Sequence, residues 1–240
     1  MSQTFLTAEW RKLIMAQYIV DPAILAPFVP AGTEIDLYQG QCFVSLVGFL
    51  FDQVRVKRIR VPFHARFEEI NLRFYVLRRE AYGPYKRGVV FLREFVPRSG
   101  IAMVARKVYE EPYEVLPTSH SIKRVGVSLD VRYSWFFRRK WQTLSVEASQ
   151  VPQPIVQGSE EAFVTEHYWG YTRRRKGATS EYEVRHPAWQ IYPITRHRIY
   201  VDFATVFGPA FAGLNSREPA SVLLAEGSPV SVMSGARLKD

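Results

Sequence analysis

The chain has 240 residues, 47% of them hydrophobic and 23% charged, with a formal net charge of +9 at pH 7. These values are close to the average of soluble globular domains, and no internal repeat or long Gly/Ser linker divides the chain, so we predict one domain over residues 1–240. The sequence also excludes a membrane-spanning helix, since its longest apolar runs, such as residues 43–51, are much too short for one.

The N-terminus and the single cysteine indicate a cytoplasmic protein. The first residues lack the basic start and apolar run of a signal peptide. Cys42 cannot form an internal disulfide, and its neighbours Phe43, Val44 and Leu46 favour a small buried side chain over a nucleophile. We therefore expect the cytoplasm as the compartment and no membrane as a partner.

The first half of the chain predicts mainly strands. Apolar or alternating segments indicate four of them, at residues 9–20, 42–52, 64–78 and 88–96. The second has so few polar residues that we expect it to be buried on nearly both faces. The last two are joined by a turn-rich segment and are therefore expected to pair.

Two segments of this half favour helices. Residues 21–30 predict a short helix, in which Asp21 supplies the cap, Pro22 suits the first turn and Pro30 ends the segment. Residues 100–110 break the alternation and carry apolar side chains at the spacing of one helix face.

The second half of the chain again predicts strands. They are expected at residues 128–135, 161–174, 180–186, 197–208 and 227–235. Strands thus dominate and turn signals are frequent. The pattern indicates a mostly antiparallel α+β fold, with its sheet curled into a barrel or cone and a few short helices at one end.

Positive charge is concentrated in residues 55–60, 138–140 and 173–176. Solvated loops and hairpin tips explain such clusters, and so does attraction to anionic substrates or nucleic acid. Residues 134–141 interleave aromatic and basic side chains, as some single-strand binders do. No known nucleic-acid-binding module accompanies them, so we do not expect nucleic acid as the partner.

One predicted strand has a face that carries candidate functional side chains. Because side chains alternate along a strand, the apolar residues of 64–78 share one face and the polar ones share the other. The polar face carries Glu69, Asn71, Arg73 and Tyr75. It is either a solvated sheet face or the lining of a cavity, in which Arg73 holds an anion and Glu69 handles protons.

A second candidate face carries Thr165, His167, Trp169 and Tyr171, if residues 161–174 form one strand. Residues 180–186 offer a matching face that ends at His186. These faces predict either a packed aromatic cluster or the wall of a ligand pocket, with His167 as its titratable group.

The sequence predicts neither a metal nor a cofactor. The five histidines lack zinc-site spacing, and His64 and Glu68 are four residues apart on a predicted strand, where they do not form a close chelating pair. There is no Walker loop, no GxGxxG and no GxSxG motif.

Taken together, several stretches resemble the bacterial DUF2071 family, also called YqjF-like. They lie in order along the chain, at residues 5–36, 43–51, 67–76, 88–98, 166–171, 182–189 and 225–232. The family is placed in the acetoacetate decarboxylase-like superfamily. The resemblance implies a cone-shaped, largely antiparallel β-barrel with a few helices, and it favours a Glu69 face that points into a cavity. The oligomeric decarboxylases imply a homo-oligomer, which the aromatic surplus permits.

The decarboxylases carry two lysines after a Gly-x-Pro, the first of which forms a Schiff base with the keto substrate. Residues 105–114 keep the arginine at Arg106 and the proline at Pro112, but Tyr113 and Glu114 occupy the lysine positions. Schiff-base decarboxylation needs an unprotonated amine, which a phenol and a carboxylate do not supply. The resemblance therefore argues against acetoacetate decarboxylase activity and leaves any enzymatic activity open.

A second departure lies before the first helix, where the decarboxylases have Tyr-Arg-Thr-Asp and this chain has Ile19 in place of the arginine. The resemblance implies that Glu69 matches the barrel glutamate of the decarboxylases and that Arg73 replaces the missing arginine as an anchor for an anion. Lys107 lies where the decarboxylases have an acid, and an ordinary surface lysine is the simpler interpretation of it.

Three hypotheses follow. The first is a pocket for a small anionic or carbonyl compound, held by Arg73 or Arg106, with Glu69, Tyr113 or His167 moving protons and Trp169 and Tyr171 as walls. The second is a lyase or aldolase that uses a relocated lysine, such as Lys107 or Lys12. The third is a basic, aromatic-rich interaction module for nucleic acid or a protein.

Overall fold

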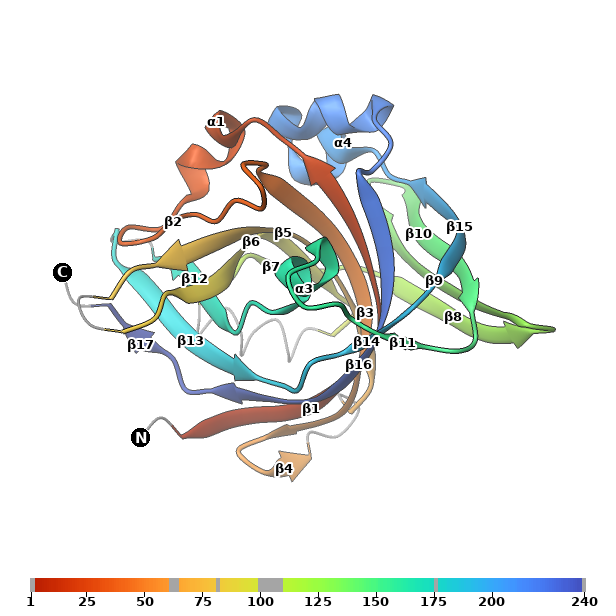
Figure 1. Ribbon diagram of the computed structural model, residues 1–240, viewed down its shortest axis with the longest axis horizontal. Helices are drawn as coiled ribbons and strands as arrows, with labels where there is room; N and C mark the ends of the chain where they lie inside the picture. The colour runs from red at the N-terminus through yellow and green to blue at the C-terminus, as the bar shows by residue number, and fades with distance from the viewer. Residues whose placement is uncertain (1–2, 61–64, 81–82, 99–109, 175–176, 239–240) are drawn as a thin grey trace.

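The computed structural model describes residues 3–60, 65–80, 83–98, 110–174 and 177–238. Two β-sheets make up most of it, and the larger curls into a ring while the smaller stands at one side (Figure 1). Among these residues no helix is both long and apolar enough to cross a membrane.

The ring passes from strand to strand in the order β16-β1-β3-β5-β6-β12-β13, and β13 pairs with β16 again through Val184 and Val232. Its strands are β1 (Thr4–Ile19), β3 (Phe43–Val56), β5 (Phe67–Arg78), β6 (Lys86–Val96), β12 (Trp169–Arg173), β13 (Thr179–Arg185) and β16 (Ser221–Met233). All neighbours pair antiparallel except β6 and β12. The predicted mostly antiparallel, ring-like sheet is thus confirmed.

Short strands extend the ring at its edges. They are β2 (Glu34–Ile35), β4 (Ile59–Arg60), β7 (Tyr113–Val115), β11 (Gln153–Pro154), β14 (Gln190–Tyr192) and β17 (Ala236–Arg237). The smaller sheet has the order β15-β10-β9-β8. Its strands are β8 (Thr118–Val125), β9 (Ser128–Phe137), β10 (Lys140–Ser149) and β15 (Ile194–Tyr200).

The helical elements are short: α1 (Pro22–Leu25), η1 (Ala26–Phe28), α3 (Glu160–Thr165), α4 (Phe203–Phe207) and η2 (Pro209–Ser216). Asp21 caps α1 as predicted, since its carboxylate accepts a 2.8 Å hydrogen bond from the backbone N–H of Ala23. Helices α1 and α4 lie together at one end of the molecule (Figure 1), and Phe28 and Phe211 are in contact there, with ring centroids 6.4 Å apart.

Two predicted strands are wrong in part. Residues 161–174 form the end of α3 before β12 begins, because Ser159 accepts a hydrogen bond from Ala162 N–H and two glutamates occupy the first helical turn. Residues 197–208 change from β15 to α4 where Asp202 caps the helix. Thr165 and His167 therefore do not share a strand face with Trp169. The helix predicted at residues 100–110 falls almost wholly outside the described residues.

The ring strands separate two cores, which explains why their sequences are apolar on both faces. On β3, Val44, Leu46 and Leu50 join the core between the ring and the smaller sheet, while Val47 and Phe49 join the core inside the ring. Gly48 permits the close approach of the smaller sheet, since a Cβ there would lie 3.1 Å from the ring of Tyr133. Cys42 is buried as predicted.

Candidate functional site

A cavity of about 320 Å³ lies inside the ring. Its wall is largely aromatic and aliphatic, as expected of a small-molecule site. The apolar lining includes Trp10, Phe49, Phe51, Phe67, Phe91, Trp169 and Trp189.

Strand β5 supplies the polar part of the wall, as the alternation of its sequence predicts. Glu69, Asn71 and Arg73 line the cavity, and each is at least nine-tenths buried. Ile70, Leu72 and Phe74 point the other way, into the core between the sheets. Of the two interpretations of this face, the cavity lining is therefore the one that the geometry supports.

Glu69 is held by two hydrogen bonds. The Asn71 side-chain amide donates to Oε1 and the Tyr113 hydroxyl donates to Oε2, both at 3.0 Å. Burial raises the pKa of Glu69 to about 7, although both bonds and the charge of Arg73 act in the opposite direction. Glu69 thus exchanges protons near neutral pH, which is the property of an efficient general acid or base.

Two further carboxyl groups lie close to Glu69, and sequence reasoning missed both. Glu111 lines the cavity and accepts a hydrogen bond from the Tyr182 hydroxyl, and burial raises the pKa of its carboxyl to about 8. Glu94 is 1% exposed, and the Tyr113 hydroxyl lies beside its carboxyl group and acts to lower its pKa. Burial, and then the neighbouring Glu111 and Glu69, raise the pKa of Glu94 well above its ordinary value.

Arg73 is the cation whose charge acts on Glu69. Its Nη2 donates to the carbonyl of Val164 at 3.2 Å, while its Nε has no partner within the described part of the chain. Its guanidinium lies 5.8 Å from the centre of the Tyr75 ring. Arg73 therefore keeps donor capacity that a ligand can use.

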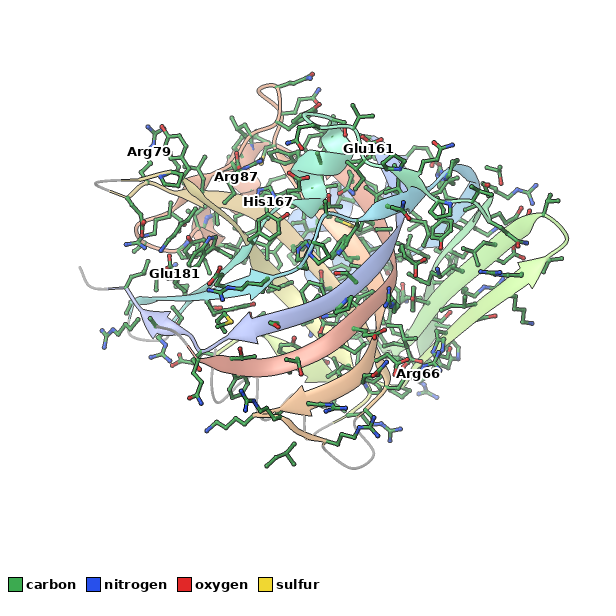
Figure 2. The ribbon with its side chains drawn as sticks, turned by 60° about the horizontal axis from the view of Figure 1, so that its bottom comes forward. Arg66, Arg79, Arg87, Glu161, His167 and Glu181 are labelled. Carbon is green, nitrogen blue, oxygen red and sulfur yellow. The ribbon has the colours of Figure 1, made fainter. Side chains whose placement is uncertain are left out.

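His167 also lines the cavity, where its ring packs against Tyr75 of β5 with centroids 4.7 Å apart, and it is oriented by a hydrogen bond. Its Nε2 lies 3.0 Å from Asp36 Oδ2, which also accepts a 2.7 Å hydrogen bond from Arg87 Nε. Figure 2 shows Arg87 and His167 close together below α3. Burial lowers the pKa of His167 to about 4, and its hydrogen bonds lower the pKa of Asp36 despite burial. A neutral His167 therefore donates from Nε2 to Asp36 and keeps a lone pair on Nδ1.

This arrangement predicts which ring nitrogen of His167 carries the proton. We expect ¹⁵N NMR of ring-labelled histidine to show His167 protonated on Nε2 alone between pH 5 and pH 8. In Asp36→Asn the acceptor is replaced by an amide, so the Nδ1-protonated form is expected to become the major one. His167→Gln identifies the resonances. Protonation of Nδ1 in the unsubstituted protein would contradict the assignment.

The remaining predicted residues are distributed as follows. Trp169 and His186 line the cavity, and His186 stacks on Trp189 with ring centroids 4.4 Å apart. His167 and His186 thus belong to one wall. Tyr171 lies in the core between the sheets and is not among the lining residues. Arg106 lies outside the described residues.

The described lining of the cavity contains no lysine. Lys12 lies elsewhere, paired with Glu226 and donating to the Tyr192 hydroxyl at 2.8 Å. Glu114 pairs with Arg93, whose Nε lies 3.1 Å from its Oε2. Lys107 lies outside the described residues. Among the residues that are described, no group of three or more His, Cys, Asp or Glu side chains forms a candidate metal site.

Comparison with protein families gives a match over nearly the whole chain. The model of DUF2071, described as an uncharacterized conserved protein, matches residues 7–229. The uncharacterized protein YqjF of Bacillus subtilis (strain 168) is 31% identical over 105 residues. These residues are 43% of this chain and 41% of YqjF, so the match spans less than half of that relative. The resemblance read from the sequence is thereby confirmed.

Comparison with solved structures confirms the acetoacetate decarboxylase-like fold. The acetoacetate decarboxylase of Legionella pneumophila superposes with a TM-score of 0.67 at 10% identity, over 98% of this chain and 88% of that one. An acetoacetate decarboxylase-like enzyme of Sphingomonas wittichii RW1 gives 0.67 at 12% identity, over 99% and 94%. The enduracididine biosynthesis enzyme MppR, complexed with pyruvate, gives 0.67 at 14% identity, over 100% and 92%. At such identities the likeness establishes the fold alone.

Proposed function

We propose, for a chain that belongs to the DUF2071 family of uncharacterized conserved proteins, that its cavity binds a small, largely apolar compound with a carbonyl or carboxylate group and exchanges a proton with it through Glu69. The observation that carries this proposal is a buried carboxyl group with a pKa of about 7 in the wall of a cavity of about 320 Å³.

The polar wall matches such a ligand. Arg73 has an unpartnered Nε among the described residues and can hold a carboxylate, while a protonated Glu69 can donate to a carbonyl oxygen. The aromatic part of the wall accommodates an apolar body. Among the structural neighbours, MppR is described in complex with pyruvate, which supports 2-oxo acids as the first compounds to test.

The proposed chemistry involves no imine. Tyr113, at the position of the decarboxylase lysine, donates a hydrogen bond to Glu69 and so holds the proposed proton carrier. Lys12 is paired with Glu226 and is not among the described lining residues, which argues against it as a relocated nucleophile. Lys107, outside the described residues, is the lysine that an experiment has to address.

Ligand binding in the cavity is expected to be tighter at low pH than at high pH. Compounds from a panel of aromatic and aliphatic 2-oxo and 3-oxo acids should bind about tenfold more tightly at pH 6 than at pH 8, since protonation of Glu69 removes a negative charge beside the ligand. Glu69→Gln should abolish most of this dependence, and the matched control Glu34→Gln, at an exposed glutamate, should leave it unchanged. Calorimetric titration measures each affinity; no binding by any compound at pH 6 would refute the proposal.

Imine formation is tested separately. Intact-mass analysis after borohydride treatment with the same acids should show no adduct, while an acetoacetate decarboxylase treated in parallel is trapped. A stable adduct mapped to a lysine would replace the proposed proton exchange by Schiff-base chemistry.

A further inference from the structure

We propose that the outer face of the smaller sheet, formed by β8, β9, β10 and β15, binds single-stranded nucleic acid. This surface is separate from the cavity, and the proposal does not rest on the function proposed for the cavity. The inner face of the same sheet is occupied, because Leu129, Val131, Tyr133 and Trp135 pack into the core between the sheets. In the part of the chain that the structure describes, no helix or further strand lies over the outer face (Figure 1).

Most of the net charge of the chain lies on this sheet. Residues 118–149 and 194–200 contain two acidic residues, Asp130 and Glu147, and eight basic ones. The basic residues are Lys123, Arg124, Arg132, Arg138, Arg139, Lys140, Arg196 and Arg198. The difference, 8 − 2, gives +6 of the total of +9. All eight basic side chains are exposed, and the strand register places Lys123, Arg132, Arg196 and Arg198 on the outer face together with Asp130 and Glu147. Arg138 and Arg139 form the turn between β9 and β10. Such a surface attracts a polyanion.

The strand register places arginines at defined positions across this face. Arg132 of β9 pairs with Ser145 of β10, which pairs with Arg198 of β15. Neighbouring strands are about 4.8 Å apart, so the two arginines stand roughly 10 Å apart on a flat row with a serine between them. They line a shallow hollow of about 220 Å³, whose other charged lining residues are Lys123, Arg196, Asp130 and Glu147. Guanidinium groups and hydroxyls at such positions are suited to phosphate oxygens.

Exposed aromatic side chains stand next to the arginine row. Trp141 and Tyr200 are 48% and 69% exposed. Trp141 contacts Phe136, with ring centroids 5.4 Å apart, and Tyr200 is paired with Thr143, two residues further along β10 on the same face. Large exposed aromatics are stacking platforms for unpaired bases, whatever the base.

The arginine row and the exposed aromatic side chains have the relative position that single-stranded nucleic acid requires. Arg132 and Phe136 are four residues apart on one strand, which corresponds to about 13 Å and to the same face. A chain whose phosphates lie on the arginine row can therefore turn its bases toward the aromatic end of the sheet. A duplex hides its base faces, and an acidic polypeptide has no planar rings for Trp141 and Tyr200. The combination thus selects a single-stranded nucleic acid.

Fluorescence anisotropy with labelled 12-nucleotide single-stranded RNA and DNA of mixed sequence tests the proposal. In 50 mM salt we expect binding that weakens steeply as salt is added. Arg132→Ser/Arg198→Ser should weaken it about tenfold or more and reduce the slope of log affinity against log salt by about 1.4, or 0.7 for each lost phosphate contact. Trp141→Ala should weaken it roughly 5- to 100-fold with little change in slope.

Matched controls separate this surface from net charge. Arg79→Ser/Arg185→Ser removes two exposed arginines outside the sheet, and Figure 2 shows Arg79 at the far side of the molecule from it. Tyr85→Ala removes an aromatic that is 58% exposed beside Arg79. Both controls should bind nearly as the unsubstituted protein does. The proposal is overturned if no oligonucleotide binds or if the control variants lose as much affinity as the test variants. It is also overturned if duplex DNA or polyglutamate binds as tightly as the single-stranded oligonucleotides.

Discussion

The free energy of unfolding is expected to decrease between pH 5 and pH 8, and Glu94→Gln is expected to remove a large part of that decrease. The cause is the group of buried carboxyls. Their pKa values are raised in the folded protein, to about 7 for Glu69, to about 8 for Glu111 and well above the ordinary value for Glu94. Above pH 4.5 the unfolded chain releases these protons and the folded chain retains them, so stability falls as pH rises through the folded pKa values.

The size of the effect follows from the linkage. Each such group lowers the free energy of unfolding by up to about 1.4 kcal/mol per pH unit between its two pKa values, so Glu69 alone contributes on the order of 3 kcal/mol. At pH 8, Glu94→Gln should be more stable than the unsubstituted protein by about 1–3 kcal/mol, because the substitution removes a buried carboxyl group whose pKa is raised by folding. At pH 4.5 the two should be nearly equal.

Urea denaturation at four pH values measures this difference. Glu34→Gln, at a half-exposed glutamate, serves as the control and should change stability by less than about 0.5 kcal/mol at each pH. His167 affects stability at lower pH. Its pKa is about 4 in the folded protein, so below pH 6.5 the unfolded chain binds a proton that the folded chain does not, and stability falls as pH decreases. Identical pH profiles of the free energy of unfolding for Glu94→Gln and the unsubstituted protein would show that Glu94 does not cause the loss of stability at high pH.

The period of two along a strand predicted which side chains of β5 share a face, and it left open whether that face is solvated or lines a cavity. It placed Glu69, Asn71 and Arg73 on one face of β5, and the apolar character of the opposite face showed that the strand was part of a packed sheet. It failed at Thr165 and His167, because the hydrophobic pattern of residues 161–174 hides a helix. The capping Ser159 with Glu160 and Glu161 after it was the available signal for that helix.

The rest of the site depends on long-range pairing, which no local pattern encodes. Asp36 reaches His167 over 131 positions, and Tyr182 reaches Glu111 over 71. Glu94 lies in an apolar segment of β6, where its sequence context alone indicates an ordinary strand. The resemblance to the decarboxylases predicts that Tyr113 stands at the position of their Schiff-base lysine. The structure adds that the phenol donates to Glu69.

Gly170→Ala is expected to destabilise the protein by about 2–4 kcal/mol and to abolish ligand binding in the cavity. Gly170 lines the cavity and is paired with Tyr182 on the neighbouring strand. A Cβ at this position would lie 2.5 Å from Cε1 of Tyr182 and closer still to its Cζ and hydroxyl. Tyr182 is 7% exposed and lines the cavity, so its ring can move only into the space of the cavity. The cost combines overpacking with the loss of the hydrogen bond to Glu111.

A double-substitution cycle shows whether this clash is the cause. If it is, Gly170→Ala should cost much less in a Tyr182→Ala background, since the ring that meets the new methyl group is absent. Gly213→Ala is the control, because a Cβ there meets no atom within 4 Å, and it should change the free energy of unfolding by less than about 0.5 kcal/mol. Urea denaturation provides all five stabilities. An unchanged cost of Gly170→Ala without the Tyr182 ring would mean that backbone conformation, and not the shape of the cavity wall, requires glycine at this position.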